Sequence, residues 1–363
     1  MADLSVEFAG LRLEHPLICS SGPLTYSAVG IQRVWRAGAS AAVTKTIRPD
    51  RALNPIPHLV RADHLGSLLN SEKWSDLPAE QWIQTEIPAL RLQGGGVLIV
   101  SLGHTPAEVS RLAGAVAAAG AHAIEVVSYQ SNDLARSVRA AVDQCGVPVF
   151  AKLSANWPNL SGVVEGCLSA GASGFTAIDS IGPALSLDIE LRRPRLSGPS
   201  GMGWLSGRAI KPIAVRVVAE LALEHDVPIL GVGGVASAED VVEMVLAGAV
   251  AVQAHSAPVL AGLGWFRRTL QSLDRWLDNH GVAAIADLRG AALPALREEE
   301  VSGDLDLKFD PAICSECRLC VEACPYGARE LDSGLMTVDR MLCRSCGLCV
   351  SVCPTGALEA GCH

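Results

Sequence analysis

Eight cysteines near the carboxyl end of the chain form two runs with the same spacing. Each run reads C-x2-C-x2-C-x3-C-P. The members are Cys314, Cys317, Cys320 and Cys324 in the first run, and Cys343, Cys346, Cys349 and Cys353 in the second. This spacing supplies thiolates to two [4Fe–4S] clusters, and the fourth cysteine of each run ligates the other cluster. We therefore expect Cys353 to complete the first cluster and Cys324 to complete the second.

Structural zinc is the alternative for these cysteines. Zinc sites usually take paired C-x2-C knuckles, with four ligands for each ion. Two runs of three plus one, each followed directly by proline (Pro325 and Pro354), match that pattern poorly. Because such clusters move single electrons, we expect another redox group in or near the chain.

A second set of residues that could bind a ligand follows short apolar runs in the first part of the chain. It includes two lysines, Lys45 and Lys152, and the glycine pair Gly233 and Gly234. Glycines after one strand and a small hydroxyl residue after the next hold a phosphate through backbone N–H groups in many barrels. The segment 231–236 also fits a dinucleotide fingerprint, but the next strand does not end in an acidic residue. A mononucleotide phosphate site is therefore favoured.

The elements that position these residues are strands alternating with helices. Apolar runs predict strands at 16–19, 41–44, 97–101, 123–127, 147–152, 174–178, 228–231 and 250–254. Helical patterns separate them, at 106–119, 134–144, 160–170, 212–225 and 238–247, and a long helix follows at 263–278. Alternation of this kind implies a parallel sheet, and eight strands imply a closed (β/α)8 barrel whose chemistry lies at the carboxyl ends of its strands. An N-terminal hairpin around Gly10 is expected to plug the other end.

The composition agrees with this α/β architecture. Hydrophobic residues make up 49% of the 363 residues and charged residues 18%, which suits a large core. A net charge of −9 and 4% aromatic residues argue against a nucleic-acid partner. Neither a signal peptide nor an apolar run of ~20 residues is visible, so we expect a soluble cytoplasmic protein with no membrane contact. The expected domains are a barrel at 1–280, a linker at 281–307 and a small α+β cluster domain of the bacterial two-cluster ferredoxin type at 308–363.

Several motifs together resemble a known family. The best-matching pieces are Ser20-Ser21-Gly22, Val43-Thr44-Lys45-Thr46, Leu69-Asn70-Ser71, Lys152-Leu153-Ser154, Leu205-Ser206-Gly207 and Val232-Gly233-Gly234-Val235. The barrel resembles the class 1 dihydroorotate dehydrogenase-like flavoproteins. The order of barrel and cluster domain resembles the C-terminal part of dihydropyrimidine dehydrogenase and the catalytic subunit of its two-subunit bacterial relatives.

This resemblance implies an FMN at the mouth of the barrel. The flavin contacts would come from Ser20, Ser21, Lys45, Thr46, Lys152 and Ser180. The ribityl phosphate would be held by Gly207, Gly233, Gly234, His255 and Ser256. A lysine beside N1 and the C2 carbonyl makes chemical sense, because reduced flavin carries negative charge there.

The expected substrate site departs from the family pattern. Family members usually carry Asn-Leu-Ser-Cys-Pro-Asn after the fourth strand, and that cysteine (or a serine) transfers the proton. This chain has Val127-Ser128-Tyr129-Gln130-Ser131-Asn132, so Gln130, which cannot act as acid or base, takes the catalytic position. Replacement proton donors would be Tyr129, His104, Ser131 or Asp179, and Asp179 stands where the family usually has Asn. The resemblance assigns Asn70, Asn132 and Asn156 to substrate binding.

These observations predict an iron–sulfur flavoprotein oxidoreductase that acts on a C–C or C=C bond of a small cyclic or conjugated substrate. Electrons would pass through the clusters to or from a ferredoxin or an NAD(P)H-oxidising flavoprotein subunit, and the resemblance implies a homo-oligomer. Three alternatives stay open. The chain could be a dihydropyrimidine dehydrogenase that is NAD(P)-linked through a partner, an electron-transfer subunit without substrate chemistry of its own, or a barrel that has lost FMN.

Overall fold

The computed structural model describes residues 2–297 and 303–361. Their contacts divide the chain into two units, Met1–Leu296 and Arg297–His363. Among the described residues no helix is long and apolar enough to cross a membrane.

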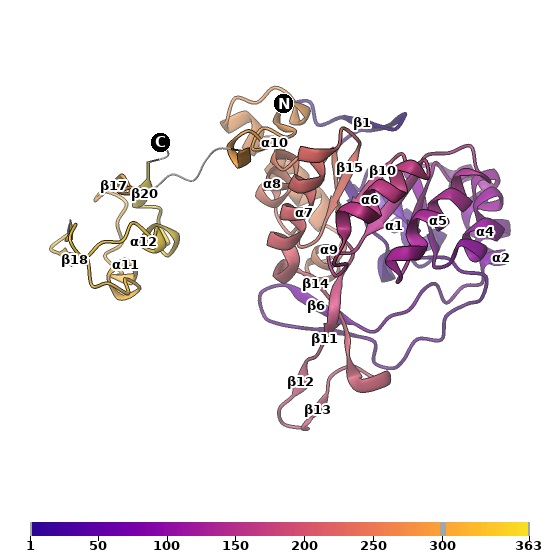
Figure 1. Ribbon diagram of the computed structural model, residues 1–363, viewed down its shortest axis with the longest axis horizontal. Helices are drawn as coiled ribbons and strands as arrows, with labels where there is room; N and C mark the ends of the chain where they lie inside the picture. Colours follow the sequence, from indigo (N-terminus) through magenta and orange to yellow (C-terminus); the bar gives the residue numbers. More distant parts are fainter. Residues whose placement is uncertain (1, 298–302, 362–363) are drawn as a thin grey trace. The chain divides into compact units, whose positions relative to one another are not determined.

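The first unit is a closed parallel barrel surrounded by helices (Figure 1). Its strands are β3 (Leu17–Cys19), β4 (Ala41–Val43), β7 (Val97–Gly103), β8 (Ala123–Val127), β9 (Val149–Leu153), β10 (Gly174–Ala177), β15 (Ile229–Val232) and β16 (Ala251–Ala254). Hydrogen bonds join them in that order, and β16 pairs with β3 to close the ring. All eight predicted strands are present, with ends that differ by no more than two residues. Apart from the partly buried Val97, their Val, Ile, Leu and Ala side chains are buried on both faces, as parallel strands under a helical layer require.

Helices form the outer layer of the barrel, and some of them begin at a side-chain cap. They are α1 (Ala28–Arg36), α2 (Ala79–Gln81), α3 (Ile87–Gln93), α4 (Pro106–Ala119), α5 (Ser131–Val142), α6 (Leu160–Ser169), α7 (Lys211–Glu224), α8 (Ala238–Leu246), α9 (Ser256–Ala261) and α10 (Trp265–Asn279). Thr105 and Ser237 cap α4 and α8, and each accepts a backbone N–H bond in a capping box. These caps fix the loops that follow β7 and β15, where site residues were predicted.

An N-terminal hairpin packs against the barrel. Strands β1 (Val6–Phe8) and β2 (Leu11–Leu13) turn at Ala9 and Gly10, both with positive φ. The Phe8 ring meets the edge of Phe150 from β9 at a centroid distance of 5.8 Å. The hairpin therefore lies near the amino end of β9, opposite the end that carries the polar residues.

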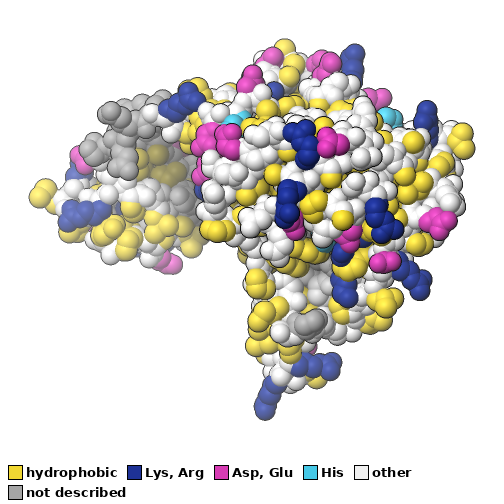
Figure 2. Space-filling model, turned by 45° about the vertical axis from the view of Figure 1, so that its right-hand side comes forward, with side chains coloured by type: hydrophobic (Ala, Val, Ile, Leu, Met, Phe, Trp, Pro, Cys, Tyr) yellow, Lys and Arg dark blue, Asp and Glu magenta, His cyan; other side chains and the backbone are white. Residues whose placement is uncertain are grey.

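A second sheet was not predicted from the sequence. It is four-stranded, in the order β11 (Ile181–Ala184), β14 (Gly203–Gly207), β6 (Ser67–Asn70) and β5 (Leu59–Arg61). An arm with β12 (Leu187–Asp188) and β13 (Arg193–Pro194) extends from β11 and β14 (Figure 1). The arm exposes hydrophobic side chains such as Ile189 alongside arginines at its tip (Figure 2).

The stretch after α10 packs on the barrel instead of leaving it. Asp3 donates a backbone hydrogen bond to Ala283, Gly290 donates one to Val245, and Ile285 is fully buried. The expected linker of 281–307 therefore has a folded first half, and its residues 298–302 lie outside the described part.

The second unit is an internal repeat of short elements. It contains β17 (Leu307–Phe309), α11 (Leu319–Glu322), β18 (Arg329–Asp332), β19 (Leu335–Val338), α12 (Leu348–Ser351) and β20 (Leu358–Ala360). Strand β17 pairs with β20, and β18 pairs with β19. Each helix starts one residue before the third cysteine of a run, after a left-handed residue, Arg318 (φ 61°) or Gly347 (φ 74°).

Candidate active site and cluster sites

A cavity of about 430 Å³ opens at the carboxyl ends of the barrel strands. All eleven residues that were expected to bind the flavin line it, namely Ser20, Ser21, Lys45, Thr46, Lys152, Ser180, Gly207, Gly233, Gly234, His255 and Ser256. They come from segments more than 200 residues apart in the sequence, and closure of the barrel brings them together. The second sheet forms another part of the wall through Leu59, Leu68, Asn70, Gly182 and Trp204.

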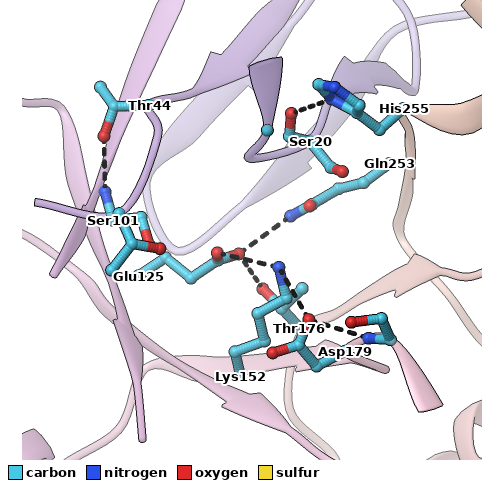
Figure 3. Close-up of polar contacts among 12 residues, drawn as sticks. Ser20, Thr44, Ser101, Glu125, Lys152, Thr176, Asp179, Gln253 and His255 are labelled. Carbon is cyan, nitrogen blue, oxygen red and sulfur yellow. Dashed lines mark hydrogen bonds and ion pairs between the residues drawn. The ribbon is translucent and has the colours of Figure 1, made fainter. Parts of the chain in front are cut away.

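A buried carboxylate that the sequence reasoning missed lies under the cavity. Glu125 on β8 is 0% exposed and accepts from side chains of three other strands (Figure 3). Thr176 Oγ1 donates to Glu125 Oε2 at 2.9 Å, and Gln253 Nε2 donates to the same oxygen at 3.3 Å. Lys152 Nζ lies 3.5 Å from Glu125 Oε1. In the sequence, Glu125 can be picked out only as the single acidic residue of an otherwise apolar strand.

The pKa values of the two lysines are shifted in opposite directions. Burial acts to lower the pKa of Lys152, but the carboxylates of Glu125 and of Asp179, at 3.9 Å, outweigh burial and raise it. Burial lowers the pKa of Lys45, although its ion pair with Glu72 at 2.5 Å acts in the opposite direction. Glu72, which follows the Asn70-Ser71 motif directly, was also missed. Both lysines are therefore paired within the protein.

The cavity wall fits a flavin nucleotide on two counts. Gln253 Oε1 is buried without a hydrogen-bond partner among the described residues, and its Nε2 is committed to Glu125. A buried acceptor of this kind calls for a donor from a ligand, and the isoalloxazine ring carries an N–H group. The backbone at Gly233 (φ 129°) and Gly234 (φ 77°) also has positive φ, and a Cβ on Gly234 would lie 2.6 Å from Lys211 Cβ. Only glycine therefore presents its backbone to the cavity there without strain.

His255 joins the last barrel strand to the first. Its Nδ1–H donates to the Ser20 carbonyl at 2.8 Å, and its Nε2 accepts from the Leu24 backbone at 3.4 Å. Burial lowers its pKa to about 4, so the ring is neutral at pH 7. Since both ring nitrogens already make hydrogen bonds, the ring holds the end of β16 to the segment after β3. A phosphate could therefore be bound by the backbone of His255 but not by its ring.

The predicted catalytic residues are only partly brought together. Tyr129, His104 and Asp179 line the cavity, and the His104 and Tyr129 rings meet edge to face at 3.9 Å. Asn70 and Asn156 also line it, with side chains that donate to the carbonyls of Trp204 and Gly182. Gln130 and Asn132 are exposed and do not line it, because α5 begins at Ser131, earlier than expected, and carries them away.

Two of these groups have protonation states that the sequence could not give. Burial and the Arg48 guanidinium lower the pKa of His104 to about 4, and its Nδ1 is buried without a partner among the described residues. His104 is therefore neutral at pH 7, which argues against it as the proton donor. Desolvation and the Asp179 carboxylate raise the pKa of Tyr129 to about 12, although the residue is half exposed.

Aromatic residues form much of the remaining wall. Trp204 stacks on Tyr129 at 6.4 Å with an interplanar angle of 13°, and Trp157 also lines the cavity. Neither tryptophan was predicted as a site residue, although Trp204 directly precedes the matching motif at Leu205. In a chain with so few aromatic residues, this grouping favours a planar substrate.

The cluster unit contains two small pockets, each surrounded by four cysteines. One is lined by Cys314, Cys317, Cys320 and Cys353, and the other by Cys324, Cys343, Cys346 and Cys349. Each pocket thus contains three cysteines of one run and the fourth of the other, which is the arrangement a [4Fe–4S] pair needs. In the described part of the chain no three His, Cys, Asp or Glu side chains lie close enough to hold a single metal ion.

Comparison with known proteins decides the family. A dihydroorotate dehydrogenase family model matches residues 117–277, and a 4Fe-4S dicluster domain model matches residues 313–357. The catalytic subunit of dihydroorotate dehydrogenase B (NAD(+)) from Pelobacter propionicus is 31% identical over 305 residues, which covers 80% of this chain and 98% of that protein. The chain belongs to the dihydroorotate dehydrogenase family. Catalytic subunits of the same name from Pyrococcus abyssi (32% identical, 80% of this chain and 99% of that one) and Methanosarcina mazei (33%, 80% and 95%) agree.

Family membership confirms several predictions. The chain is an iron–sulfur flavoprotein oxidoreductase of the CH–CH type, with FMN and two [4Fe–4S] clusters as cofactors. The barrel and the cluster domain are likewise confirmed. About a fifth of the chain lies outside the match to these dihydroorotate dehydrogenase relatives.

The buried histidines predict a loss of stability in acid. His104 and His255 both have a pKa of about 4 in the folded chain, against 6.5 when unfolded, so the unfolded state binds more protons between these values. Each histidine should remove about 2 kcal/mol of unfolding free energy between pH 7 and pH 5. In urea titrations followed by flavin fluorescence, His104→Asn should abolish about half of the combined loss caused by the two histidines. His64→Asn, at an exposed position, should leave that loss unchanged. An unchanged pH dependence in His104→Asn would contradict this assignment.

The exchange of fourth ligands predicts a pair of selective defects. Cys353→Ser should impair the cluster of Cys314, Cys317 and Cys320, and Cys324→Ser should impair the other cluster. Iron analysis with electron paramagnetic resonance (EPR) of the reduced proteins should show one normal cluster in each variant, and a different one. If both variants lose signal from the same cluster, the exchanged arrangement is wrong.

Proposed function

We propose that this chain transfers a hydride between FMN and a carbon–carbon bond of a small, uncharged, planar substrate, and exchanges the electrons singly with a protein partner through its clusters. FMN, when bound, supplies hydride exchange at N5 and links two-electron to one-electron chemistry. The observation that carries the proposal is the composition of the cavity wall. All residues expected to bind the flavin line one part of it, and the aromatic side chains of Tyr129, Trp157 and Trp204 line another part.

The flavin side would hold the cofactor with the residues predicted for it. Lys45 and Lys152 would place positive charge beside the pyrimidine part of the isoalloxazine, and Gln253 would accept a hydrogen bond. The backbone of Gly207, Gly233, Gly234 and Ser256 would hold the phosphate. Ser206 Oγ and Ser256 Oγ lie 2.9 Å apart, which supports a hydroxyl-lined phosphate end.

The charges of the cavity favour an uncharged substrate. A substrate carboxylate would meet Lys45 already paired with Glu72, and Lys152 already paired with Glu125 and Asp179. Lys73, the remaining lysine of the wall, is exposed at the mouth. The planar wall of Tyr129 and Trp204 suits a heterocycle or a conjugated ring.

Tyr129 is the best-placed proton donor. Its hydroxyl keeps its proton well above neutral pH, and its ring lines the cavity between His104 and Trp204. During reduction of a C=C bond, one carbon receives the hydride and the other a proton, which Tyr129 would donate. His104 is neutral, and its Nδ1 has no partner among the described residues, so it would orient the substrate by accepting or donating one hydrogen bond.

The electron partner is proposed to be an NAD(P)H-oxidising flavoprotein subunit or a ferredoxin. The name of the relatives, the catalytic subunit of an NAD(+)-linked enzyme, supports the first of these. A homo-oligomer stays a prediction from the family resemblance.

A substrate panel tests the proposed substrate class. The protein is reduced anaerobically, and flavin absorption is followed after addition of uracil, orotate, or uncharged cyclic enones and heterocycles. We expect rapid reoxidation by an uncharged compound and none by the anion orotate. A response to uracil would identify a dihydropyrimidine dehydrogenase. Reoxidation by orotate, or silence across the panel with activity towards protein partners alone, would overturn the proposal.

Tyr129→Phe tests the proton donor, with the best substrate of the panel. Loss of general acid catalysis should lower the rate of flavin reoxidation by roughly 10²–10⁴-fold. The flavin spectrum and substrate affinity should change little, because the ring and its stacking stay. Tyr26→Phe, outside the cavity, is the matched control. A Tyr129→Phe variant as fast as this control would exclude Tyr129 as the donor.

A further inference from the structure

A buried arginine in the cluster unit has no partner for its terminal nitrogens among the described residues. Arg329, the first residue of β18, is 4% exposed. Neither of its terminal guanidinium nitrogens has a hydrogen-bond partner among the described residues. Arg318, by contrast, donates from its guanidinium to the Leu331 carbonyl at 2.7 Å.

An isolated guanidinium is costly to bury. Arginine stays charged in proteins, and removal of an unpaired ion from water carries a large free-energy cost. A folded chain therefore needs an anion or strong acceptors next to such a group. The acceptor must lie where the guanidinium lies, and Arg329 lines the pocket of Cys324, Cys343, Cys346 and Cys349.

The cluster of that pocket meets this requirement. A [4Fe–4S] cluster with four thiolate ligands is an anion in both of its ordinary oxidation states, and its sulfurs accept hydrogen bonds. Its potential depends on the net charge around it and on hydrogen bonds to its sulfurs. Because reduction adds negative charge, a neighbouring cation stabilises the reduced form more than the oxidised form.

The internal repeat provides a comparison within the same unit. Ala328-Arg329 in the first half corresponds to Ala357-Leu358 in the second. Leu358 is 3% exposed and lines the other pocket, with Cys314, Cys317, Cys320 and Cys353. The two pockets are alike in their thiolates, and each is also lined by an exposed arginine, Arg344 or Arg318. At the corresponding position, however, one has a buried cation where the other has an apolar side chain. The charge of Arg329 also acts on the Cys320 thiol of the other pocket, but its side chain lines only the pocket of Cys324, Cys343, Cys346 and Cys349 among the pockets of the described residues.

We propose that Arg329 donates hydrogen bonds to the sulfurs of the cluster held by Cys324, Cys343, Cys346 and Cys349, and so raises its reduction potential relative to the other cluster. Arg329 is then a tuning residue and not a cluster ligand. The cluster beside it is the first to be reduced, and an electron that enters the unit rests there.

The test is an anaerobic redox titration of the full chain with both clusters loaded, followed by EPR. Arg329→Leu places in the first half the side chain that its repeat already has. The reduction potential of the cluster held by Cys324, Cys343, Cys346 and Cys349 should fall by at least ~59 mV, which corresponds to a tenfold change in a one-electron reduction equilibrium. Arg329→Lys, which keeps the charge, should restore most of the shift. The two single-serine variants Cys324→Ser and Cys353→Ser assign the signals.

Arg340→Leu is the matched control, because it removes the same charge from an exposed position of the same unit. Its effect should be small, since solvent and salt screen exposed charges. If Arg329→Leu fails to load both clusters, Arg329→Met, with an unbranched apolar side chain, takes its place in the comparison. Fully loaded Arg329→Leu or Arg329→Met with both potentials no further from wild type than those of Arg340→Leu would overturn the proposal.

Discussion

The buried pair of Glu125 and Lys152 is the interaction on which the barrel site depends. Two charges are removed from water at the base of the cavity, and only close pairing and further hydrogen bonds make that tolerable. Thr176 and Gln253 supply those bonds, so four strands are tied to one carboxylate. Loss of the Lys152 charge would leave the Glu125 carboxylate buried with no opposite charge beside it among the described residues, at a cost of about 3–5 kcal/mol. The same bonds fix the direction of Lys152 and turn the free oxygen of Gln253 away from Glu125.

The flavin side and the substrate side of the cavity are formed by segments with different conformational freedom. On the flavin side, residues from β3, β4, β9, β15 and β16 stand at strand ends, where the backbone of a closed barrel leaves little freedom. On the substrate side, the wall comes from loops and from the second sheet, whose strands are not bound by barrel closure. This division explains how one family can keep a cofactor site while its substrate-binding residues change.

The sequence predicted those features that depend on local pattern. Apolar runs and helical periodicity predicted the barrel, and cysteine spacing predicted the two clusters together with their exchanged ligands. The second sheet was not predicted because β6 and β14 are short and come from segments more than 130 residues apart in the sequence. Gln130 and Asn132 lie outside the cavity, which the sequence did not predict, because the start of α5 decides which way that loop faces. Glu125 and the low pKa of His104 depend on partners from distant segments, which no single stretch of sequence reveals.

Closure of the barrel by its first and last strands also sets the order in which the chain can mature. The β16–β3 ladder and the His255–Ser20 hydrogen bond join segments 235 residues apart. Contacts of such separation form late, because the loop entropy must be overcome first. Until residues 251–256 have left the ribosome, the nascent sheet has two open edges that could pair with other chains. The cluster unit follows in the sequence, so its cysteines emerge only after the segment that removes those edges.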